Sequence, residues 1–303
     1  MNKFKLWISV FRLRTLPLSL SGIIIAGAIA YYNGYFDIII FSFAILVTLG
    51  LQILSNLAND YGDGVKGTDN RNRIGPERGI QSGKISPKEM FDAIKINIII
   101  LIFLIFILIL SAFGTHHFLP SLVFFILGFM SIYAALKYTI GETAYGYRGL
   151  GDLMVFLFFG IISVLGAYYL FAKSLEHVLI MPACIVGLLS TAVLNLNNMR
   201  DLKSDSESDK ITVAVKLGLI RAKNYHAFLL ISALILGVLF SLLYYRSLIN
   251  LLFLVTFIPI VRHVVFVYKV QEVKELDSQL KILALSTFGF SLLLALSFIY
   301  NGI

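Results

Sequence analysis

The sequence predicts an all-α membrane protein, a bundle of nine transmembrane helices around a central cavity that opens to the cytoplasmic face. The 303 residues are 58% hydrophobic and have a mean hydropathy of +0.88, well above the values of soluble domains. Nine apolar runs each approach the roughly 20 residues that a helix needs to span the hydrocarbon. Lys and Arg are concentrated on one side of these runs. We expect residues 1–303 to form a single membrane-embedded domain.

The first apolar run follows a charged amphipathic stretch, Lys3 to Arg14, and no small-residue cleavage site follows it. We therefore interpret it as a retained helix and not as a signal peptide. Connections on one side of the membrane are only a few residues long, whereas those at 59–93 and 198–224 on the other side are long. The nine expected spans are residues 15–32, 38–58, 94–113, 117–136, 151–171, 177–197, 225–244, 247–267 and 282–300.

The orientation of the spans follows from the distribution of Lys and Arg. Of the 25 basic residues, only Lys173 and Arg246 fall on the side with the short connections, which leaves 23 on the other side. Cytoplasmic loops carry such an excess of positive charge. We therefore expect an integral membrane protein with its N-terminus in the cytoplasm and its C-terminus outside. The net charge of +8 is a topology signal and gives no argument for nucleic-acid binding.

Several common kinds of site are not indicated. Cys184 is the only cysteine, so the chain cannot form an internal disulfide or a cysteine-based metal motif. The five His are scattered without the spacing of a zinc site. The pattern Gly-x-x-x-x-Gly-Lys-Ser/Thr does not occur, so ATP hydrolysis through a P-loop is not predicted.

Two segments rich in Asn and Asp lie at the inner ends of apolar runs. The first extends from Asn56 to Asp69 after the second span, and the other from Asn195 to Asp209 after the sixth. Only 17 residues of the chain are Asp or Glu, and these segments contain six of the Asp. Ionisable residues at such positions are rare and usually functional. An even number of spans separates the segments, so we expect them to face each other across one cavity.

The spacing within these segments is helical at first. Three residues of the second segment are spaced i, i+4, i+8, which places them on one face of a helix. Two Asn–Asp pairs of the first segment are spaced i, i+4, and three glycines then predict that the helix ends, because Gly weakens a helix interior. Asp69 is expected on a loop that folds back. The spaced residues are Asn197/Asp201/Asp205, Asn56/Asp60 and Asn59/Asp63, and the glycines are Gly62, Gly64 and Gly67.

This combination of side chains indicates a metal-dependent site for a diphosphate. Facing carboxylates repel one another unless cations lie between them. Carboxylate and amide oxygens suit Mg²⁺, which usually keeps several waters and shares phosphate oxygens. Arg78, Lys137 and Arg148 in adjacent inner loops supply positive charge for an anion. The expected Mg²⁺ ligands are Asp60, Asp63, Asp69, Asn197, Asp201 and Asp205.

Five stretches of the chain resemble the UbiA-type intramembrane prenyltransferases, and among these the branch that acts on 1,4-dihydroxy-2-naphthoate in menaquinone synthesis. Two positions depart from the family's pattern. The third acid of its first motif, Asn-x-x-x-Asp-x-x-x-Asp, falls here on Gly64 or Gly67, so that Asp69 is the expected substitute. An Arg-Pro near the N-terminus of the family is Arg12-Leu13 here. The stretches are Gln52–Asp63, Ile74–Gly79, Tyr147–Asp152, Asn198–Asp201 and Lys210–Gly218.

The resemblance implies a reaction and its partners. The expected reaction is the Mg²⁺-dependent transfer of a polyprenyl group from polyprenyl diphosphate to 1,4-dihydroxy-2-naphthoate, with loss of CO₂ and diphosphate, to give demethylmenaquinone. Membrane lipid is the surrounding partner, nucleic acid is not expected, and menaquinone synthesis implies a bacterial inner membrane. We expect Tyr61 and Tyr138 to line the path of a carbocation, since aromatic faces attract cations.

The resemblance also assigns roles to residues of this sequence. We expect catalytic roles for Asp60, Asp63, Asp152, Lys137 and Arg78. The residues expected to bind substrate are Asn56, Asn59, Arg78, Lys137, Tyr138 and Asn197.

Other interpretations remain open at this point. Asp152 is suited equally to contact with the acceptor and to capping a helix N-terminus. Asn195 is suited to polar packing. Arg78 and Lys137 are also suited to anchoring the chain at the cytoplasmic surface. A sister enzyme would prenylate 4-hydroxybenzoate or another acceptor. A secondary transporter would carry its acids near the midplane of the membrane, whereas here they lie at one face, which favours an enzyme.

Overall fold

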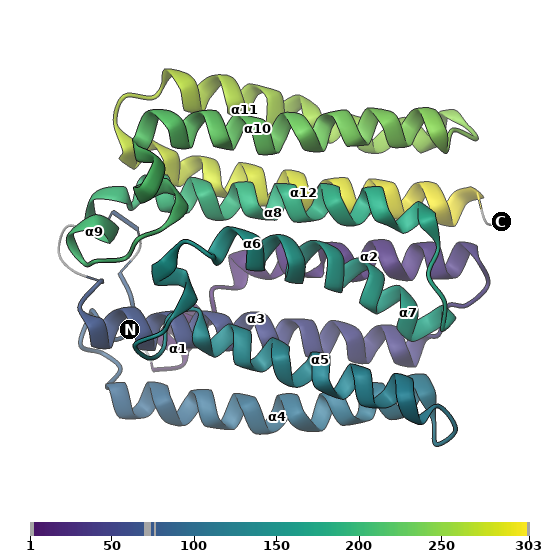
Figure 1. Ribbon diagram of the computed structural model, residues 1–303, viewed down its shortest axis with the longest axis horizontal. Coiled ribbons are helices and arrows are strands. Elements are labelled where there is room, and N and C mark those ends of the chain that lie inside the picture. Colours follow the sequence, from purple (N-terminus) through teal and green to yellow (C-terminus); the bar gives the residue numbers. More distant parts are fainter. Residues whose placement is uncertain (1–2, 70–73, 76, 302–303) are drawn as a thin grey trace.

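The computed structural model describes residues 3–69, 74–75 and 77–301, and this part of the chain contains helices and turns but no strand (Figure 1). The prediction of an all-α membrane bundle is confirmed. Arg71 and Arg73, which were counted among the cytoplasmic basic residues, and Pro76 of the stretch Ile74–Gly79 lie outside the described residues. The side chains of Lys3 and Arg14, which bound the predicted amphipathic stretch, also lie outside the description.

The helices follow the order of the predicted spans, with short helices added at the ends. The α-helices are α1 (Lys3–Phe11), α2 (Leu16–Tyr32), α3 (Ile38–Lys66), α4 (Pro87–Phe113), α5 (Phe118–Lys137), α6 (Gly151–Val155), α7 (Ala167–Ala172), α8 (Ile180–Arg200), α9 (Leu202–Glu207), α10 (Val213–Leu243), α11 (Phe257–Lys269) and α12 (Leu276–Asn301). A π-helix, Phe156–Gly166, joins α6 to α7. Short 3-10 helices cover Leu13–Thr15, Tyr145–Arg148, His177–Leu179, Leu248–Thr256 and Val273–Glu275.

Among the described residues, eight continuous helical stretches are long and apolar enough to cross a membrane. The remaining predicted span, residues 15–32, corresponds to α2, a shorter apolar helix of 17 residues. Several helices extend beyond the predicted spans on the polar side. For example, α4 begins at Pro87, where Ser86 and Glu89 form a capping box. Hydropathy marks where a helix meets hydrocarbon, and a capped polar turn can continue past that point.

The predicted loss of helix at Gly62 and Gly64 is wrong, because α3 continues to Lys66. A Cβ at Gly62 would lie 2.6 Å from Thr139 Oγ1, so this glycine allows α3 to approach the chain that follows α5. Gly67 does end the helix, with a φ of 75° in the left-handed region that glycine adopts without strain. Two of the three glycines thus serve close packing and one serves termination.

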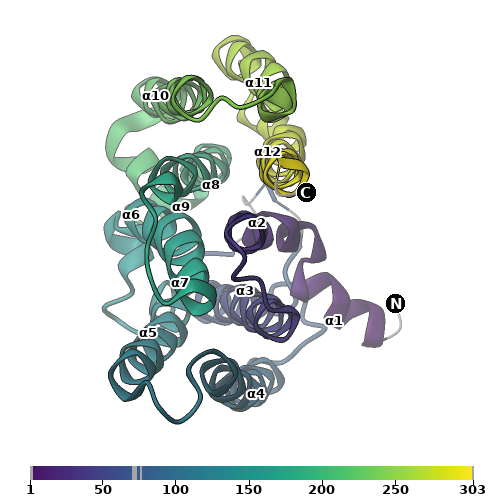
Figure 2. The same cartoon turned by 90° about the vertical axis from the view of Figure 1, so that its right-hand side faces the viewer.

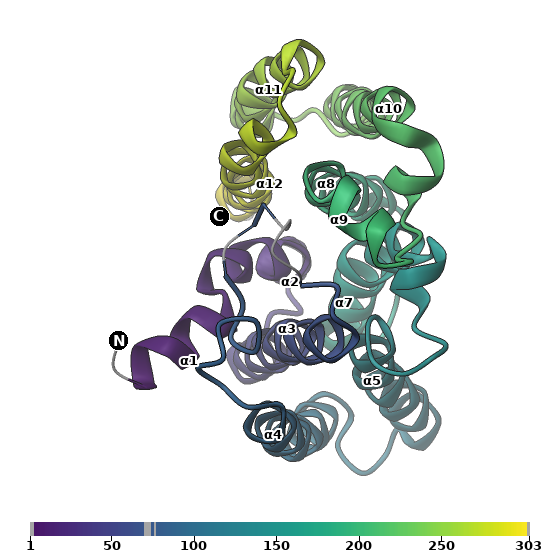
Figure 3. The same cartoon turned by 90° about the vertical axis from the view of Figure 1, so that its left-hand side faces the viewer.

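The first and last long helices pack against each other in the middle of the molecule. α2 contacts α3 on one side and α12 on the other, and α12 also packs against α8. Viewed along the bundle, α4 and α5 lie on one flank and α10 and α11 on the other (Figure 2 and Figure 3). α1, α9 and the long loops gather at one end, whereas α12 finishes at the opposite end (Figure 1).

The π-helix between α6 and α7 is unusually long. It spans 11 residues, whereas most π-helical segments are single turns, often at functional sites. It packs tightly on α8, where a Cβ at Gly160 would lie 2.6 Å from Ala183 O, and on α2, where a Cβ at Gly22 would overlap Ser163. Glycines at these crossings let the backbones approach, as is usual between membrane helices.

Candidate active site

The structure brings the two Asn/Asp segments together at one end of the bundle. Lys210 Nζ lies 3.3 Å from Asp63 Oδ2 of the first segment and 3.6 Å from Asp205 Oδ1 of the second. The connection between α5 and α6 joins the same cluster, because Ile211 N donates to Tyr147 O of that connection at 3.2 Å. Three connections that are distant in the sequence therefore form one polar surface.

Asp60 lies at the centre of the first group of charges and is 1% exposed. It accepts hydrogen bonds from Arg12, from Arg78 NH1 at 2.7 Å and from Gly79 N at 3.3 Å. Arg78 Nε lies 3.9 Å from Asp69 Oδ1, and Asp69 is on a loop that folds back on the end of α3, as predicted. Asp60, Arg78 and Asp69 are thus adjacent.

Asp63 belongs to a second group, which contains Tyr147 and two lysines. Tyr147 OH donates to Asp63 Oδ1 at 2.8 Å and lies 2.6 Å from Thr68 Oγ1. Lys66 Nζ lies 3.9 Å from the centre of the Tyr147 ring, and Lys210 Nζ 5.6 Å from it. Burial raises the pKa of Tyr147, and the Asp63 carboxylate raises it further, so the phenol stays protonated.

Lys210 and Asp205 perturb each other's pKa. Burial raises the pKa of Asp205 to about 6, and Lys210 only partly offsets this effect. For Lys210 burial alone would disfavour the charge, but the carboxylates of Asp63 and Asp205 outweigh burial and raise its pKa. Lys210 is therefore a buried ammonium ion at neutral pH.

The second motif keeps its predicted helical register across a helix boundary. α8 ends at Arg200, yet Asp201 N donates to Asn197 O at 3.1 Å and Asp205 N to Asp201 O at 2.9 Å. Arg200 is 2% exposed and binds Asp201 through two bonds of 2.9 and 2.6 Å, and it also binds Asn197 Oδ1 at 2.8 Å. A further bond from Arg200 reaches Asp277 in the first turn of α12.

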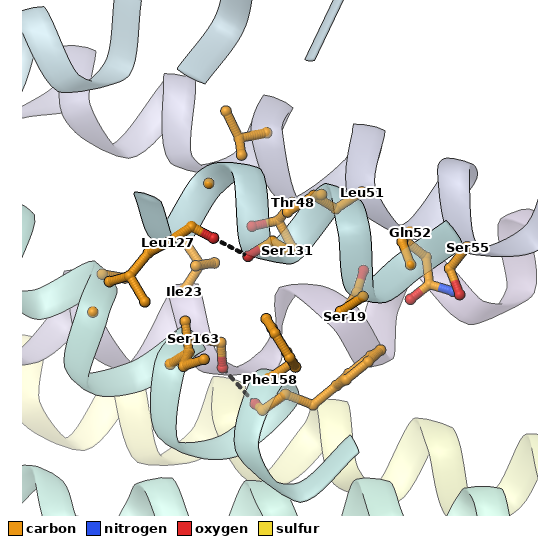
Figure 4. Close-up of a pocket in the computed structure, with 18 of the residues that line it drawn as sticks. Ser19, Ile23, Thr48, Leu51, Gln52, Ser55, Leu127, Ser131, Phe158 and Ser163 are labelled. Carbon is orange, nitrogen blue, oxygen red and sulfur yellow. Dashed lines mark hydrogen bonds between the residues drawn. The ribbon is translucent and has the colours of Figure 1, made fainter. Parts of the chain in front are cut away.

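An apolar cavity runs along the bundle beside these charges, between α2, α3, α4, α5 and the segment from α6 to α7 (Figure 4). Its lining residues on α3 extend from Ala44 to Asn59, a rise of about 22 Å along a helix. The cavity encloses about 1480 Å³ of space, part of it open to the surroundings. Its dimensions suit a long apolar chain.

The hydroxyls on the cavity wall are mostly bonded to their own helices. Ser131 donates to Leu127 O at 2.7 Å and Ser163 to Phe159 O (Figure 4). Ser19 donates to Leu16 O at 2.8 Å. Such bonds use the only donor of each hydroxyl, so these side chains have no hydrogen left to donate to a ligand.

One end of the cavity is polar and adjoins the charged cluster. Asn59 lines it one residue before Asp60, together with Gln52 and Tyr138. The rings of Tyr138 and Tyr145 meet edge to face with centroids 5.4 Å apart. Burial raises the pKa of both phenols. A bound molecule would therefore meet aromatic faces and amide groups where the apolar cavity joins the charges.

Four of the predicted site residues do not line the cavity. Asn56 donates to Phe11 O at 2.9 Å and so fastens the N-terminal segment. Lys137 Nζ lies 3.4 Å from Thr143 Oγ1 in its own connection. Asp152 is buried beside Tyr225 and does not line the cavity.

The fourth residue, Tyr61, packs against Phe91 with ring centroids 5.4 Å apart. It also does not line the cavity, and its position along the path of a cation stays a prediction. Asn195 is fully buried, and its side-chain amide has no hydrogen-bond partner in the described part of the chain.

Sequence reasoning missed four basic or aromatic residues of the cluster: Arg12, Tyr147, Arg200 and Lys210. Tyr147, Arg200 and Lys210 lie in stretches that were singled out for their resemblance, and Arg12 lies where the sequence departs from the family's Arg-Pro, but no site role was predicted for any of them. Arg12 has a left-handed φ of 50°, which turns the chain between α1 and α2 toward Asp60. A search for the counter-ions that buried acids require would have indicated candidates, though not which base pairs with which acid.

The donors of the cluster suit Mg²⁺ by their chemistry. They are carboxylate and amide oxygens, the ligands that Mg²⁺ prefers, and it takes only one or two carboxylates when phosphate oxygens complete its shell. No three Asp, Glu, His or Cys side chains converge on a metal position within the described ranges. Asp60, Asp63, Asp201 and Asp205 instead carry basic partners.

Comparisons with known proteins agree with this geometry. Residues 20–288 match the UbiA prenyltransferase family. The chain is 46% identical over 253 residues to the 1,4-dihydroxy-2-naphthoate octaprenyltransferase of Escherichia coli (strain K12), which covers 84% of this chain and 82% of that protein. The apo structure of a UbiA homolog from Aeropyrum pernix K1 superposes with a TM-score of 0.64 at 15% identity, over 93% of this chain and 97% of that one.

A second solved structure carries ligands. It is a UbiA homolog from Archaeoglobus fulgidus bound to DMAPP and Mg²⁺, with a TM-score of 0.57 at 13% identity, over 93% of this chain and 98% of that one. At such identities the two solved structures support the fold, whereas the family match and the bacterial relative support membership. The chain therefore belongs to the UbiA prenyltransferase family.

Proposed function

We propose that this protein transfers a polyprenyl group from polyprenyl diphosphate to 1,4-dihydroxy-2-naphthoate, with release of diphosphate and CO₂, to give demethylmenaquinone. The observation that carries the proposal is the junction of a long apolar cavity with a charged cluster built from both Asp motifs. The 46% identity to a bacterial enzyme of that name favours the naphthoate as acceptor.

The diphosphate would bind at the charged end of the cavity. Arg78 and Arg12 are held beside Asp60, and Lys66 and Lys210 surround Tyr147, so positive charge lines two sides of the cluster. Fixed cationic groups stabilise negative charge as it develops on a leaving group. When bound by Asp60, Asp63, Asp69, Asn197, Asp201 and Asp205, Mg²⁺ would neutralise much of the charge of the diphosphate.

The isoprenoid tail would lie in the apolar cavity, with its reactive end at the polar junction. Tyr138 lies at this junction, and its ring would face an allylic carbocation. Asn59 and Gln52 supply hydrogen-bonding groups for the naphthoate at the same end. Binding that fixes both reactants in one orientation removes much of the entropic barrier to their reaction.

The proposed location is a bacterial inner membrane, with the charged cluster on the cytoplasmic side. Water-soluble diphosphate would then leave into the cytoplasm. The prenylated product, which carries no charged carboxylate, would remain in the bilayer.

A turnover assay with protein in detergent tests the proposal. The donor is a long-chain prenyl diphosphate, and 1,4-dihydroxy-2-naphthoate and 4-hydroxybenzoate are compared as acceptors with and without Mg²⁺. Mg²⁺-dependent prenylation with CO₂ release from the naphthoate alone is the expected result. Prenylation of the benzoate would retain the donor chemistry and overturn the acceptor. Failure to release diphosphate with either acceptor would contradict the naphthoate reaction.

A further inference from the structure

Lys210 occupies the one position in the described structure where a single cation touches both Asp motifs. Its Nζ lies 3.3 Å from Asp63 Oδ2 and 3.6 Å from Asp205 Oδ1, and the residue is 9% exposed. Within the described residues, no other basic side chain forms an ion pair with Asp63 or Asp205. Without this ammonium, Asp63 and Asp205 would be two buried carboxylates with no ion-pair partner among the described residues, which is strongly unfavourable.

The main chain around Lys210 is fixed, whereas its side chain is long and flexible. Lys210 N donates to Asp205 O at 2.9 Å, and the next residue bonds Tyr147 O. Asp209 takes a left-handed φ of 53° just before it. The ammonium of lysine is a mobile point charge on a four-carbon stem, so it can exchange partners while the backbone stays in place.

The contacts of Lys210 conflict with those of a metal ion at the same oxygens. Mg²⁺ binds oxygen at about 2.1 Å and requires a nearly ideal octahedral shell. An ammonium that contacts Asp63 and Asp205 occupies the space and the lone pairs that such a shell would use. One of the two cations must leave those oxygens when the other binds them.

We propose that Lys210 is a built-in counter-ion that holds the two Asp motifs together while the site is empty, and that it moves from Asp63 and Asp205 to the diphosphate when Mg²⁺ and substrate bind. The proposal rests on the Mg²⁺–diphosphate site described above. Lys210 thereby competes with the metal for carboxylate oxygens and cooperates with it in binding the anion. A residue with a purely structural role would do neither.

The two effects have opposite signs and can be measured without turnover. Mn²⁺, which takes the same oxygen ligands, is titrated into detergent-solubilised protein, and the loss of the free-ion EPR signal gives its Kd. For Lys210→Met we expect Mn²⁺ alone to bind at least about fivefold more tightly, the lower range of couplings between ligands. Inorganic diphosphate in the presence of Mn²⁺ should bind more weakly by a similar factor.

Two further variants make the experiment decisive. Lys210→Arg retains the charge and contacts carboxylates through two donors, so it should bind Mn²⁺ no more tightly than the wild type, even if Lys210→Met does not fold. Lys203→Met makes the same chemical change at an exposed position of α9 and should leave both affinities unchanged.

A melting experiment gives an independent readout. In EDTA, Lys210→Met should melt below the wild type, and a given Mg²⁺ concentration should raise its Tm by more than it raises that of the wild type, because tighter ligands stabilise more. If Mn²⁺ binds Lys210→Met no more tightly than the wild type, the counter-ion proposal is overturned. If the wild type itself binds no Mn²⁺ in the presence of diphosphate, the metal site of the proposed function is wrong instead.

Discussion

At the scale of single residues, the acids of the site accept hydrogen bonds from different kinds of donor. Asp60 is bound by guanidinium groups and a backbone N–H, Asp201 by the two donors of Arg200, and Asp63 by a phenol and a lysine. Arginine is always charged and forms two-point contacts, whereas lysine is more mobile. The arginine-bound acids are therefore the rigid part of the cluster.

Asp60→Asn should abolish most activity and also weaken the fold. The change leaves two guanidinium groups without their carboxylate, and breaking a buried ion pair costs about 3–5 kcal/mol. We expect kcat/KM to fall at least about 100-fold, a loss of about 2.7 kcal/mol of transition-state stabilisation, and a clear fall in Tm. Turnover and melting measurements check both effects.

Asp92→Asn is the matched control, because the Asp92–Lys95 pair is exposed and such pairs contribute about 0–1 kcal/mol. Near-normal turnover of Asp60→Asn at saturating Mg²⁺ would remove Asp60 from the catalytic residues.

Asp277→Asn tests whether α12 orients the second motif. Asp277 touches no expected ligand of the metal, but it binds Arg200, which binds Asp201. Loss of such an outer partner lowers metal affinity by about 10–100-fold, and we expect the low end because Asp277 is 39% exposed. The Mg²⁺ concentration for half-maximal activity should rise, with little change in the KM of the naphthoate.

Glu275→Gln, an exposed change in the preceding turn, is the control for Asp277→Asn. If Asp277→Asn changed the Mg²⁺ concentration for half-maximal activity and the KM of the naphthoate equally, or changed neither, a positioning role would be contradicted.

At the scale of the elements, α3 illustrates what residue type cannot reveal. The propensity of glycine predicts a helix end at Gly62, but tertiary packing against Thr139 requires a residue without a Cβ there. The ladder of Asn197, Asp201 and Asp205, in contrast, was predictable, since the i, i+4 spacing fixes a shared face even where α8 passes into α9. Local periodicity is contained in the sequence, whereas the identity of the neighbour is not.

Gly62→Ala and Gly289→Ala should shift stability in opposite directions. The new Cβ at Gly62 would lie 2.6 Å from Thr139 Oγ1 and 2.8 Å from its carbonyl carbon, and overpacking of this kind costs about 1–3 kcal/mol. At Gly289 in α12 the nearest atom is 3.6 Å away, an ordinary contact. Alanine there should stabilise the helix by up to about 1 kcal/mol.

Melting of the two glycine variants side by side in one detergent measures the difference. A Gly62→Ala protein as stable as Gly289→Ala would show that α3 does not need to approach Thr139 so closely.

At the scale of the whole molecule, the nine predicted spans correspond to helices because composition and length decide whether a segment enters hydrocarbon. The meeting of the two Asp segments also followed from the sequence, because an even number of crossings returns the chain to the same side. The pairing of Lys210 with Asp63 and Asp205, and of Arg200 with Asp277, did not follow. Such pairs depend on how helices that are distant in sequence pack, which one sequence does not specify.

Fusions to the two ends test the proposed orientation. An odd number of spans would put the termini on opposite sides, and the excess of Lys and Arg predicts that the N-terminus lies in the cytoplasm. Alkaline phosphatase fused after residue 303 should be active in bacteria, and green fluorescent protein at the same position should be dark. The same reporters fused before residue 1 should give the reverse result. A fluorescent C-terminal fusion would mean that the orientation is inverted or that one span does not cross.

The packing of α2 against α12 has a consequence for how cells make this protein. The two helices come from opposite ends of the chain, and Arg200, at the end of α8, forms an ion pair with Asp277 of α12. During synthesis the surface of α2 and the side chain of Arg200 therefore stay without their α12 partners, in the translocon or the lipid, until the last span is inserted. The enzyme therefore becomes competent only after the ribosome has nearly finished. Chains that end before α12 would carry both Asn/Asp segments, yet would lack the packing partner of α2 and the Asp277 partner of Arg200.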